Sequence, residues 1–206
     1  MIEKQLTLTE QKTIRFYRAK GKYGFLSNLY MHPILFEDKL FPTSEHAYQY
    51  GKYKDPKTRA WVMEAPYPHL VAIISHNLFV WDIVEKWSKM RVNRMYYILK
   101  TKFKDPHLAK RLLDTKETIL LEDSSMDPFW GIGKKGTGKN MLGKLLMKVR
   151  EELREGKIKT RKLEHKIYYY KCPNCGKEFE KNDPEYYDYC WDCYQNEKKK
   201  IYLKRE

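Results

Sequence analysis

All four cysteines of this 206-residue chain lie in its last quarter, as two Cys-x-x-Cys pairs. The pairs are Cys172-Pro-Asn-Cys175 and Cys190-Trp-Asp-Cys193, separated by 14 residues. Each pair can form a knuckle that directs both sulfurs at one tetrahedral ion, so this spacing is typical of a structural four-thiolate Zn2+ site. Gly176 follows the first pair and permits the backbone turn that such a knuckle needs. We therefore expect a small zinc-ribbon-like module over residues 166–206.

Two disulfides or a redox-active pair are the alternatives to zinc. A cytoplasmic setting disfavours disulfides, and the duplication of the motif disfavours a redox pair. The module has few apolar residues to bury, so we expect its folding to depend on the metal. Its aromatic side chains, interleaved with lysines, can stack on nucleic-acid bases or equally cover a tiny core. These aromatic residues are Tyr168, Tyr169, Tyr170, Tyr186, Tyr187, Tyr189 and Trp191.

The chain ahead of this module divides into a larger domain, residues 1–156, and a basic linker, residues 157–165, where the apolar periodicity stops. The formal net charge is +14 at pH 7, and residues 157–206 hold 13 basic and 9 acidic side chains. Most of the positive charge therefore belongs to the larger domain. Such an excess favours a polyanionic partner: nucleic acid, a nucleotide or an anionic membrane. A basic protein kept soluble by self-repulsion is the alternative.

No segment of the sequence has the pattern of a membrane anchor or a secretory leader. The most apolar stretch, Leu70 to Trp81, is interrupted by polar residues and is too short to span a bilayer. The first twelve residues carry charges and no apolar block. A cytoplasmic location is the resulting expectation.

The larger domain is expected to be α+β and mainly helical. Short strands are predicted within 13–17 and 35–41, with a turn at Asp38 in the second range. A helix capped by Thr43 or Ser44 is predicted to run through Tyr53. Apolar residues at helical spacing predict further helices over 87–103 and 140–153.

A glycine-rich segment, Gly133-Lys-Lys-Gly-Thr-Gly138-Lys139-Asn140, nearly matches the phosphate loop G-x-x-x-x-G-K-[ST]. Asn140 stands where the magnesium-binding hydroxyl is required, and no strand sequence directly precedes the loop, so an NTPase is disfavoured. A glycine-rich turn that leads into a helix can still offer backbone N–H groups to a phosphate. A flexible surface loop is the alternative.

Polar residues gather in two further places. Glu45, Gln49 and Lys52 are spaced i, i+4 and i+7 and would share one helix face, as an acid/base pair or a solvated ion pair. Ser27 and Asn28 lie between large apolar residues, a pattern that indicates polar groups held against a packed wall.

Taken in order, these segments make the chain resemble the NADAR family, which includes the YbiA-like riboflavin-intermediate N-glycosidases. The resemblance runs from about residue 14 to residue 153 and leaves the zinc module outside. The matching stretches are Phe16-Tyr17, Gly24-Phe-Leu-Ser-Asn-Leu, Phe41-Pro-Thr-Ser-Glu-His-Ala-Tyr-Gln-Tyr-Gly-Lys52, Trp87 through Arg91 to Met95, Lys102-Phe103, Asp127-Pro-Phe-Trp-Gly131 and Gly136-Thr-Gly-Lys-Asn-Met-Leu-Gly-Lys-Leu-Leu-Met147.

The resemblance implies an α+β, mainly helical fold and cleavage of an N-glycosidic bond to a phosphorylated ribose. Two substrate classes are associated with the family: early phosphoribosylamino-pyrimidine intermediates of riboflavin synthesis, and ADP-ribose attached to the amino group of guanine in nucleic acid. Both join an exocyclic amine of a pyrimidinone ring to C1 of a 5-phosphorylated ribose. One active site could therefore serve both chemistries.

Breaking such a bond builds positive charge on the sugar and negative charge on the leaving amine, so the site needs a carboxylate and a proton donor. The resemblance implies that Glu45 and Asp127 are the carboxylates. It makes Lys52 an acid, or a nucleophile that captures the ring-opened aldehyde as a Schiff base. No cofactor is implied for catalysis. The implied substrate-binding residues are Ser27, Asn28, His46, Gln49, Trp87, Arg91, Trp130, Gly131, Gly133, Gly138, Lys139 and Asn140.

Among these residues, the two tryptophans are expected to stack on the base or exclude water, and Arg91 with the 131–140 loop to hold phosphates. Arg91 stands where relatives often have lysine. The leading hypothesis is an N-glycosidase that removes ADP-ribose from guanine in DNA, with DNA contacts from the basic surface and the zinc module. Clearance of riboflavin intermediates is the second hypothesis. A non-catalytic binder of ADP-ribose or nucleic acid is the third.

Overall fold

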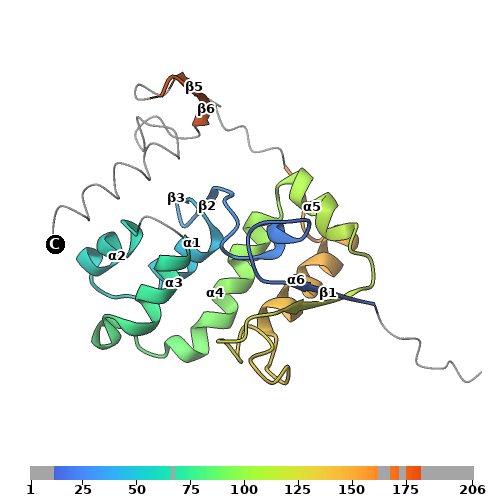
Figure 1. Cartoon of the computed structure of the whole chain (residues 1–206), viewed down its shortest axis with the longest axis horizontal. Helices are drawn as coiled ribbons and strands as arrows, with labels where there is room; N and C mark the ends of the chain where they lie inside the picture. The colour runs from blue at the N-terminus through green and yellow to red at the C-terminus, as the bar shows by residue number, and fades with distance from the viewer. Residues whose placement is uncertain (1–11, 66–67, 162–167, 172–174, 182–206) are drawn as a thin grey trace, which may run out of the picture.

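The computed structural model describes residues 12–65, 68–161, 168–171 and 175–181, and Figure 1 shows how their helices and strands are arranged. Strand β1 (Thr13–Phe16) pairs in parallel with the distant strand β4 (Ile119–Glu122), with Phe16 opposite Glu122. Alternation along β4 buries Leu120 against the core and turns the neighbouring positions away from it. This small sheet fixes where the segment after β4 begins.

A tight hairpin leads into the first helix. Strands β2 (Ile34–Phe36) and β3 (Lys39–Phe41) are antiparallel, and the two turn residues, Glu37 and Asp38, both have positive φ, as a two-residue hairpin turn requires. Helix α1 (Ser44–Tyr50) follows directly, with Thr43 as its N-cap.

The remaining helices wrap around α1 and α4 (Figure 1). Two of them begin at a proline preceded by a capping aspartate, the arrangement that best satisfies a helix N-terminus. Among the helices that the structure describes, none combines the length and apolar composition needed to cross a membrane. Their bounds are η1 (Gly24–Leu26), α2 (Pro56–Met63), α3 (Pro68–Asn77), η2 (Val80–Asp82), α4 (Trp87–Lys102), α5 (Pro106–Leu113) and α6 (Met141–Arg154).

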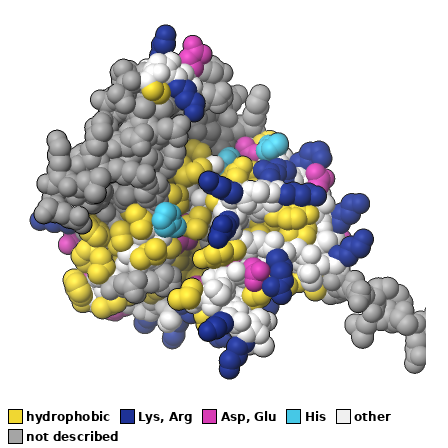
Figure 2. Space-filling view, in the orientation of Figure 1, with side chains coloured by type: hydrophobic (Ala, Val, Ile, Leu, Met, Phe, Trp, Pro, Cys, Tyr) yellow, Lys and Arg dark blue, Asp and Glu magenta, His cyan; other side chains and the backbone are white. Residues whose placement is uncertain are grey.

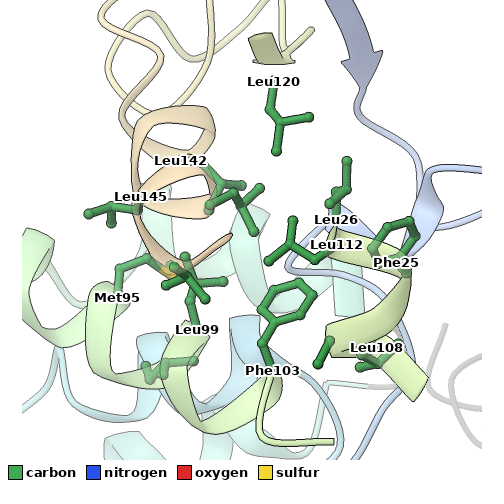
Figure 3. Packing of buried hydrophobic residues seen from close by; sticks show 14 of the residues in the cluster. Phe25, Leu26, Met95, Leu99, Phe103, Leu108, Leu112, Leu120, Leu142 and Leu145 are labelled. Carbon is green, nitrogen blue, oxygen red and sulfur yellow. The ribbon is translucent and has the colours of Figure 1, made fainter. Parts of the chain in front are cut away.

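The larger of two apolar clusters is the core shown in Figure 3, and the smaller one, Tyr53, Val62 and Val71, lies where α2 and α3 pack together. Helices α4, α5 and α6 each contribute a buried stripe, and η1 and β4 close the cluster from the other side. The labelled residues of this core are Phe25, Leu26, Met95, Leu99, Phe103, Leu108, Leu112, Leu120, Leu142 and Leu145.

Arg94 of α4 ties the hairpin to α1. Its guanidinium donates to the backbone carbonyl of Ala47 at 2.8 Å and forms an ion pair with Glu37 at 2.7 Å. The same group lies where a side chain on Gly51 would have to go, so glycine at that position lets Arg94 pack against the end of α1. The orientation of α1 is therefore set from its C-terminal end by α4.

The surface is not uniform. The face seen in Figure 2 carries Lys and Arg side chains over its right-hand part, whereas hydrophobic side chains gather on the left, where Figure 1 places α2 and α3. Exposed apolar residues of that region include Trp61, Ile73, Val80 and Trp81.

The mixed, mainly helical fold is confirmed, but two predicted boundaries differ. Helix α1 ends at Tyr50 and not at Tyr53, because Tyr53 forms an isolated bridge with Ile83 and the chain must turn to reach it. The larger folded unit also continues past residue 156, since Ile158 packs in the core and the N–H of Arg161 donates to the carbonyl of Lys104 at 3.0 Å.

In the tail, β5 (Tyr168–Lys171) and β6 (Glu178–Lys181) form an antiparallel hairpin on either side of the first Cys-x-x-Cys segment. Gly176 has a φ of 72°, the left-handed conformation that glycine adopts without strain. Cys175 is exposed. Cys172, Cys190 and Cys193 lie outside the described residues, and with them the predicted zinc site.

Gly143→Ala should destabilise the domain by about 3 kcal/mol, because α6 and β4 approach too closely to admit a side chain. A Cβ at Gly143 would lie 2.1 Å from the carbonyl oxygen of Leu120. Urea unfolding measures the change, with exposed Lys144→Ala in the same helix as the control. Equal midpoints for the two variants would contradict this packing.

Candidate active site

The polar face of α1 is buried. Glu45, His46 and Gln49 are exposed by only 8%, 4% and 3%, respectively. The helix begins inside the protein because Thr43 satisfies its first turn: the Thr43 hydroxyl accepts from the backbone N–H of His46 at 3.3 Å. Burying a carboxyl on such a helix is costly unless neighbouring groups compensate, so its surroundings indicate a site and not a solvated ion pair.

Glu45 is held by two contacts. Its carboxylate accepts from the Gln49 side-chain amide at 2.7 Å, and its backbone N–H donates to the carbonyl of Asn28 at 3.1 Å. Burial raises the pKa of Glu45 to about 7; Asp127 raises it further, while the Gln49 hydrogen bond and Lys52 oppose the shift. Glu45 can therefore exchange a proton near neutral pH.

Lys52 lies beyond the end of α1, so it does not continue the helix face as its spacing predicted. Its backbone carbonyl accepts from the N–H of Val84 at 2.9 Å, which places it beside the segment that leads into α4. Burial lowers the pKa of the Lys52 amine; Glu45 opposes this shift and Arg91 adds to it. Lys52 is therefore held within electrostatic reach of Glu45 by the turn after α1 and its backbone hydrogen bond to Val84, and not by a continuous helix face.

Asp127 organises the turn that carries Trp130. Its Oδ1 accepts from the backbone N–H groups of Phe129 and Trp130, both at 2.8 Å. Such a side-chain-to-backbone turn fixes the residues that follow the aspartate. Asp127 interacts electrostatically with Glu45, so this turn and α1 face one another.

Aromatic rings link α1, α4 and this turn. Tyr48 packs against Trp87, with ring centroids 5.1 Å apart, and against Trp130 at 5.5 Å. The indole N–H of Trp130 also hydrogen-bonds the Tyr48 phenol, and burial raises the pKa of that phenol. Both predicted tryptophans therefore meet on one tyrosine, three residues along α1 from Glu45.

Two cations lie over the neighbouring ring of Phe129. The Arg91 guanidinium carbon is 3.6 Å from the ring centroid, and Nζ of the exposed Lys139 is 5.5 Å from it. Stacking on an aromatic face orients a guanidinium while leaving its N–H edge able to bind an anion. The two cations predicted to hold phosphate are thus brought to one ring.

Several buried polar atoms near these residues have no hydrogen-bond partner within the described part of the chain. They include Asn28 Oδ1, Gln49 Oε1 and Arg91 Nε. Buried polar groups are nearly always paired in folded proteins, so unpaired ones mark places where a polar ligand can bind. These atoms come from three separate segments that surround Glu45 and its neighbours.

The glycine-rich loop uses several of its backbone N–H groups internally. The N–H of Gly138 donates to Ile132 at 2.6 Å, that of Lys139 to Pro128 at 2.7 Å, and that of Asn140 to Gly131 at 3.0 Å. These three N–H groups are therefore not available to a phosphate. Gly131 and Gly138 permit close backbone approach, since a Cβ at either would lie within 2.7 Å of a carbonyl oxygen, and Gly133 has a φ of 65°.

Three further residues expected to bind substrate make hydrogen bonds within the protein. The Asn140 side chain donates to the Leu120 carbonyl at 2.8 Å and accepts from the Glu122 N–H at 3.0 Å. The His46 ring is 2.7 Å from the capping Thr43 hydroxyl, and burial lowers its pKa to about 4. The Ser27 hydroxyl accepts from the Leu29 N–H at 3.2 Å.

Sequence reasoning missed Tyr48 and Glu122. Burial raises the pKa of Glu122 to about 8, with Asp127 and Glu45 raising it further. In the sequence, Glu122 could have been noticed as a carboxyl at the end of an apolar run, where a buried strand meets its following loop.

Within the described residues, no group of three or more His, Cys, Asp or Glu side chains is arranged to hold a metal ion.

The chain is similar in sequence and in fold to known proteins. Residues 15–154 match the NADAR domain model. The chain is 38% identical over 146 residues to the riboflavin biosynthesis protein VVA0006 of Vibrio vulnificus, covering 70% of this chain but only 40% of that protein. It is 36% identical over 141 residues to the N-glycosidase YbiA of Shigella boydii, covering 68% of this chain and 88% of that one.

A solved structure is also similar. The NMR structure of the Escherichia coli protein YbiA superposes with a TM-score of 0.65 and 32% identity, covering 77% of this chain and 94% of that one.

Glu45→Gln should stabilise the protein above pH 7 by about 2–3 kcal/mol, because it removes the cost of ionising a buried carboxyl. The raised pKa means that wild-type stability falls as pH rises from about 4.5 to about 7, whereas the variant avoids this loss. Thermal unfolding at pH 5 and pH 8 measures the difference. Exposed Glu85→Gln is the control, and a gain that is equal at both pH values would contradict the burial argument.

Proposed function

The chain belongs to the NADAR domain family, and on this premise we propose that it is an N-glycosidase. Its substrate would join the exocyclic amine of a base to C1 of a 5-phosphorylated ribose. The observation that carries the proposal is the buried Glu45, within electrostatic reach of Lys52 and beside a wall of aromatic rings. Relatives named N-glycosidase support the same reaction class.

The reaction needs negative charge near the sugar and a group that accepts C1. In its ionised form Glu45 stabilises the positive charge that develops on the ribose. Lys52, whose burial favours the neutral amine, attacks C1 and captures the opened sugar as a Schiff base, which water then hydrolyses. The Gln49 amide keeps Glu45 oriented through its 2.7 Å hydrogen bond.

The binding groups suit the two ends of such a substrate. Trp87 and Trp130 offer apolar surface on which a base can stack, and Tyr48 holds their rings together. Arg91 and Lys139, both on the Phe129 ring, provide cations for phosphate. Asn28 contributes an unpaired buried oxygen that can accept from a ribose hydroxyl or a base amine.

ADP-ribose attached to guanine in nucleic acid is the substrate that we propose first. Positive charge on the larger domain, together with Lys and Arg side chains spread over one part of the face in Figure 2, favours a polyanionic substrate. The second candidate is a phosphoribosylamino-pyrimidine of riboflavin synthesis. Relatives in Vibrio vulnificus and Zea mays named riboflavin biosynthesis proteins favour it.

Wild-type protein should release ADP-ribose from a guanine-ADP-ribosylated oligonucleotide, and Lys52→Ala should lower the rate at least about a hundredfold. Borohydride added during turnover should attach the sugar covalently to wild-type protein but not to Lys52→Ala. Mass spectrometry measures the adduct, and Lys54→Ala, which removes an exposed neighbouring amine, is the control.

The two substrates are compared side by side. Cleavage of the riboflavin intermediate alone would transfer the assignment to the second candidate. Binding of ADP-ribose without turnover of either substrate, unchanged by Glu45→Gln, would identify a non-catalytic binder.

For the tail we propose a zinc-dependent module that contacts nucleic acid. The β5–β6 hairpin around the first Cys-x-x-Cys segment and the positive φ of Gly176 suit a zinc knuckle. Structural zinc would supply the folding energy that so small a module lacks. Its tyrosines would then stack on unpaired bases.

Removal of residues 162–206 should abolish binding of one zinc equivalent and weaken single-stranded DNA binding about tenfold. Cleavage of a mononucleoside substrate should not change, because the shortened chain keeps Ile158 and Arg161 in place. Metal analysis and fluorescence anisotropy measure the two effects. Cys172→Ser in the full chain should reproduce both losses, and equal DNA affinity with and without the tail would contradict the role.

A further inference from the structure

Glu122 occupies the last position of β4, where the backbone is fixed on both sides. Its N–H donates to the Asn140 side chain at 3.0 Å, and its carbonyl accepts from the N–H of Ile132 at 2.9 Å. Strand alternation places Glu122 on the same face as the fully buried Leu120. A carboxyl is therefore directed inward at a position that leaves its backbone little freedom.

The groups that act on this carboxyl are the predicted catalytic acids. Glu45 of α1 and Asp127 of the following turn both raise its pKa, after burial itself. The residue paired with it on β1 is Phe16, and the α6 cap contributes the neutral Asn140. Two cations lie nearby: Lys52 interacts electrostatically with Glu45, and Arg91 interacts with Lys52 and with Tyr48.

Hydrogen bonding separates the three carboxyls. Glu45 accepts from the Gln49 amide, and Asp127 accepts from two backbone N–H groups, so both of these side chains receive hydrogen-bond donors. No donor reaches the side chain of Glu122 within the described part of the chain, and its Oε2 is buried without a partner. A buried carboxyl oxygen that receives no donor favours the protonated, neutral form of the group.

We propose that Glu122 is the proton donor of this site, a catalytic acid that protonates the departing base. The inference rests on the N-glycosidase reaction proposed above and assigns the one role that Glu45 and Lys52 leave unfilled.

The resulting step is balanced. The neutral amine of Lys52 forms a bond to C1, and the electron pair of the C1–N bond passes to the exocyclic nitrogen. That nitrogen takes the proton of Glu122, while Glu45 takes the proton that the Lys52 nitrogen loses. Water then releases the sugar from Lys52, and solvent returns a proton to Glu122 and removes one from Glu45.

Glu122→Gln tests the assignment, because glutamine keeps the shape and neutrality of the protonated acid but has no proton to give. At pH 7.5 its kcat should fall about 10²- to 10⁴-fold, with KM changed only a few-fold. Wild-type kcat/KM should fall as pH rises through about 8, as Glu122 loses its proton, and this alkaline limb should disappear in the variant. The acid-side limb, set by Glu45, should remain near pH 7.

The matched control is Asp123→Asn, which removes the adjacent carboxyl from the exposed ion pair with Arg15. It should retain wild-type kcat and the alkaline limb. Thermal unfolding of Glu122→Gln should show a midpoint no lower than that of the wild type, so that a loss of activity is not a loss of fold. A variant that keeps both its kcat and the alkaline limb would overturn the assignment.

A second measurement needs no substrate. Carboxyl carbon NMR of glutamate-labelled full-length protein, assigned with Glu122→Gln, should show Glu122 titrating well above an ordinary glutamate. Titration at an ordinary glutamate pKa would overturn the role of Glu122 whatever the turnover. Failure of wild-type protein to cleave either substrate would overturn the proposed function separately.

Discussion

The burial of a carboxyl on a seven-residue helix is the constraint on which the rest of the site depends. Glu45 cannot remain there without compensation, because removing a carboxylate from water costs several kcal/mol. The Gln49 amide, which donates to the carboxylate, and the Lys52 amine offset part of this cost. The Thr43 cap, the Asn28 carbonyl and Arg94 hold the helix that carries Glu45 in place. Burial disfavours the ionised form of Glu45, and the resulting rise of its pKa to about 7 lets this carboxyl exchange a proton near neutral pH.

Rigid backbone and reactive side chains are kept separate in this fold. Several backbone N–H groups of the loop between β4 and α6 donate to carbonyls of the same loop, and Asn140 fastens that loop to the strand. Binding is then left to side chains such as Arg91 and Trp130. The backbone that carries them does not need to rearrange when a substrate binds. The same fold gives Glu45 and Asp127 hydrogen-bond donors, whereas within the described part of the chain Glu122 Oε2 is buried without one.

Much of the architecture was readable because it depends on local pattern. Apolar spacing located α4 and α6, and the Asp38 turn located the β2–β3 hairpin. Helix α1 was predicted three residues too long, because nothing near Tyr53 in the sequence announces its pairing with Ile83. Nor could the sequence show which amides of the glycine-rich loop have internal acceptors, because that depends on which carbonyl lies beside each amide in the folded chain.

By itself the sequence determined the family, from the order of its motifs, and the principal helices, from apolar spacing. The resemblance to that family then made Glu45, Lys52 and Asp127 candidates. Only the tertiary structure decided which groups meet. It joined Trp87 and Trp130 through Tyr48, gave His46 and Asn140 structural contacts, and brought Glu122 of a distant strand within electrostatic reach of Glu45. The physical reason is that desolvation and hydrogen-bond pairing are properties of neighbours in space, and those neighbours lie far apart along the chain.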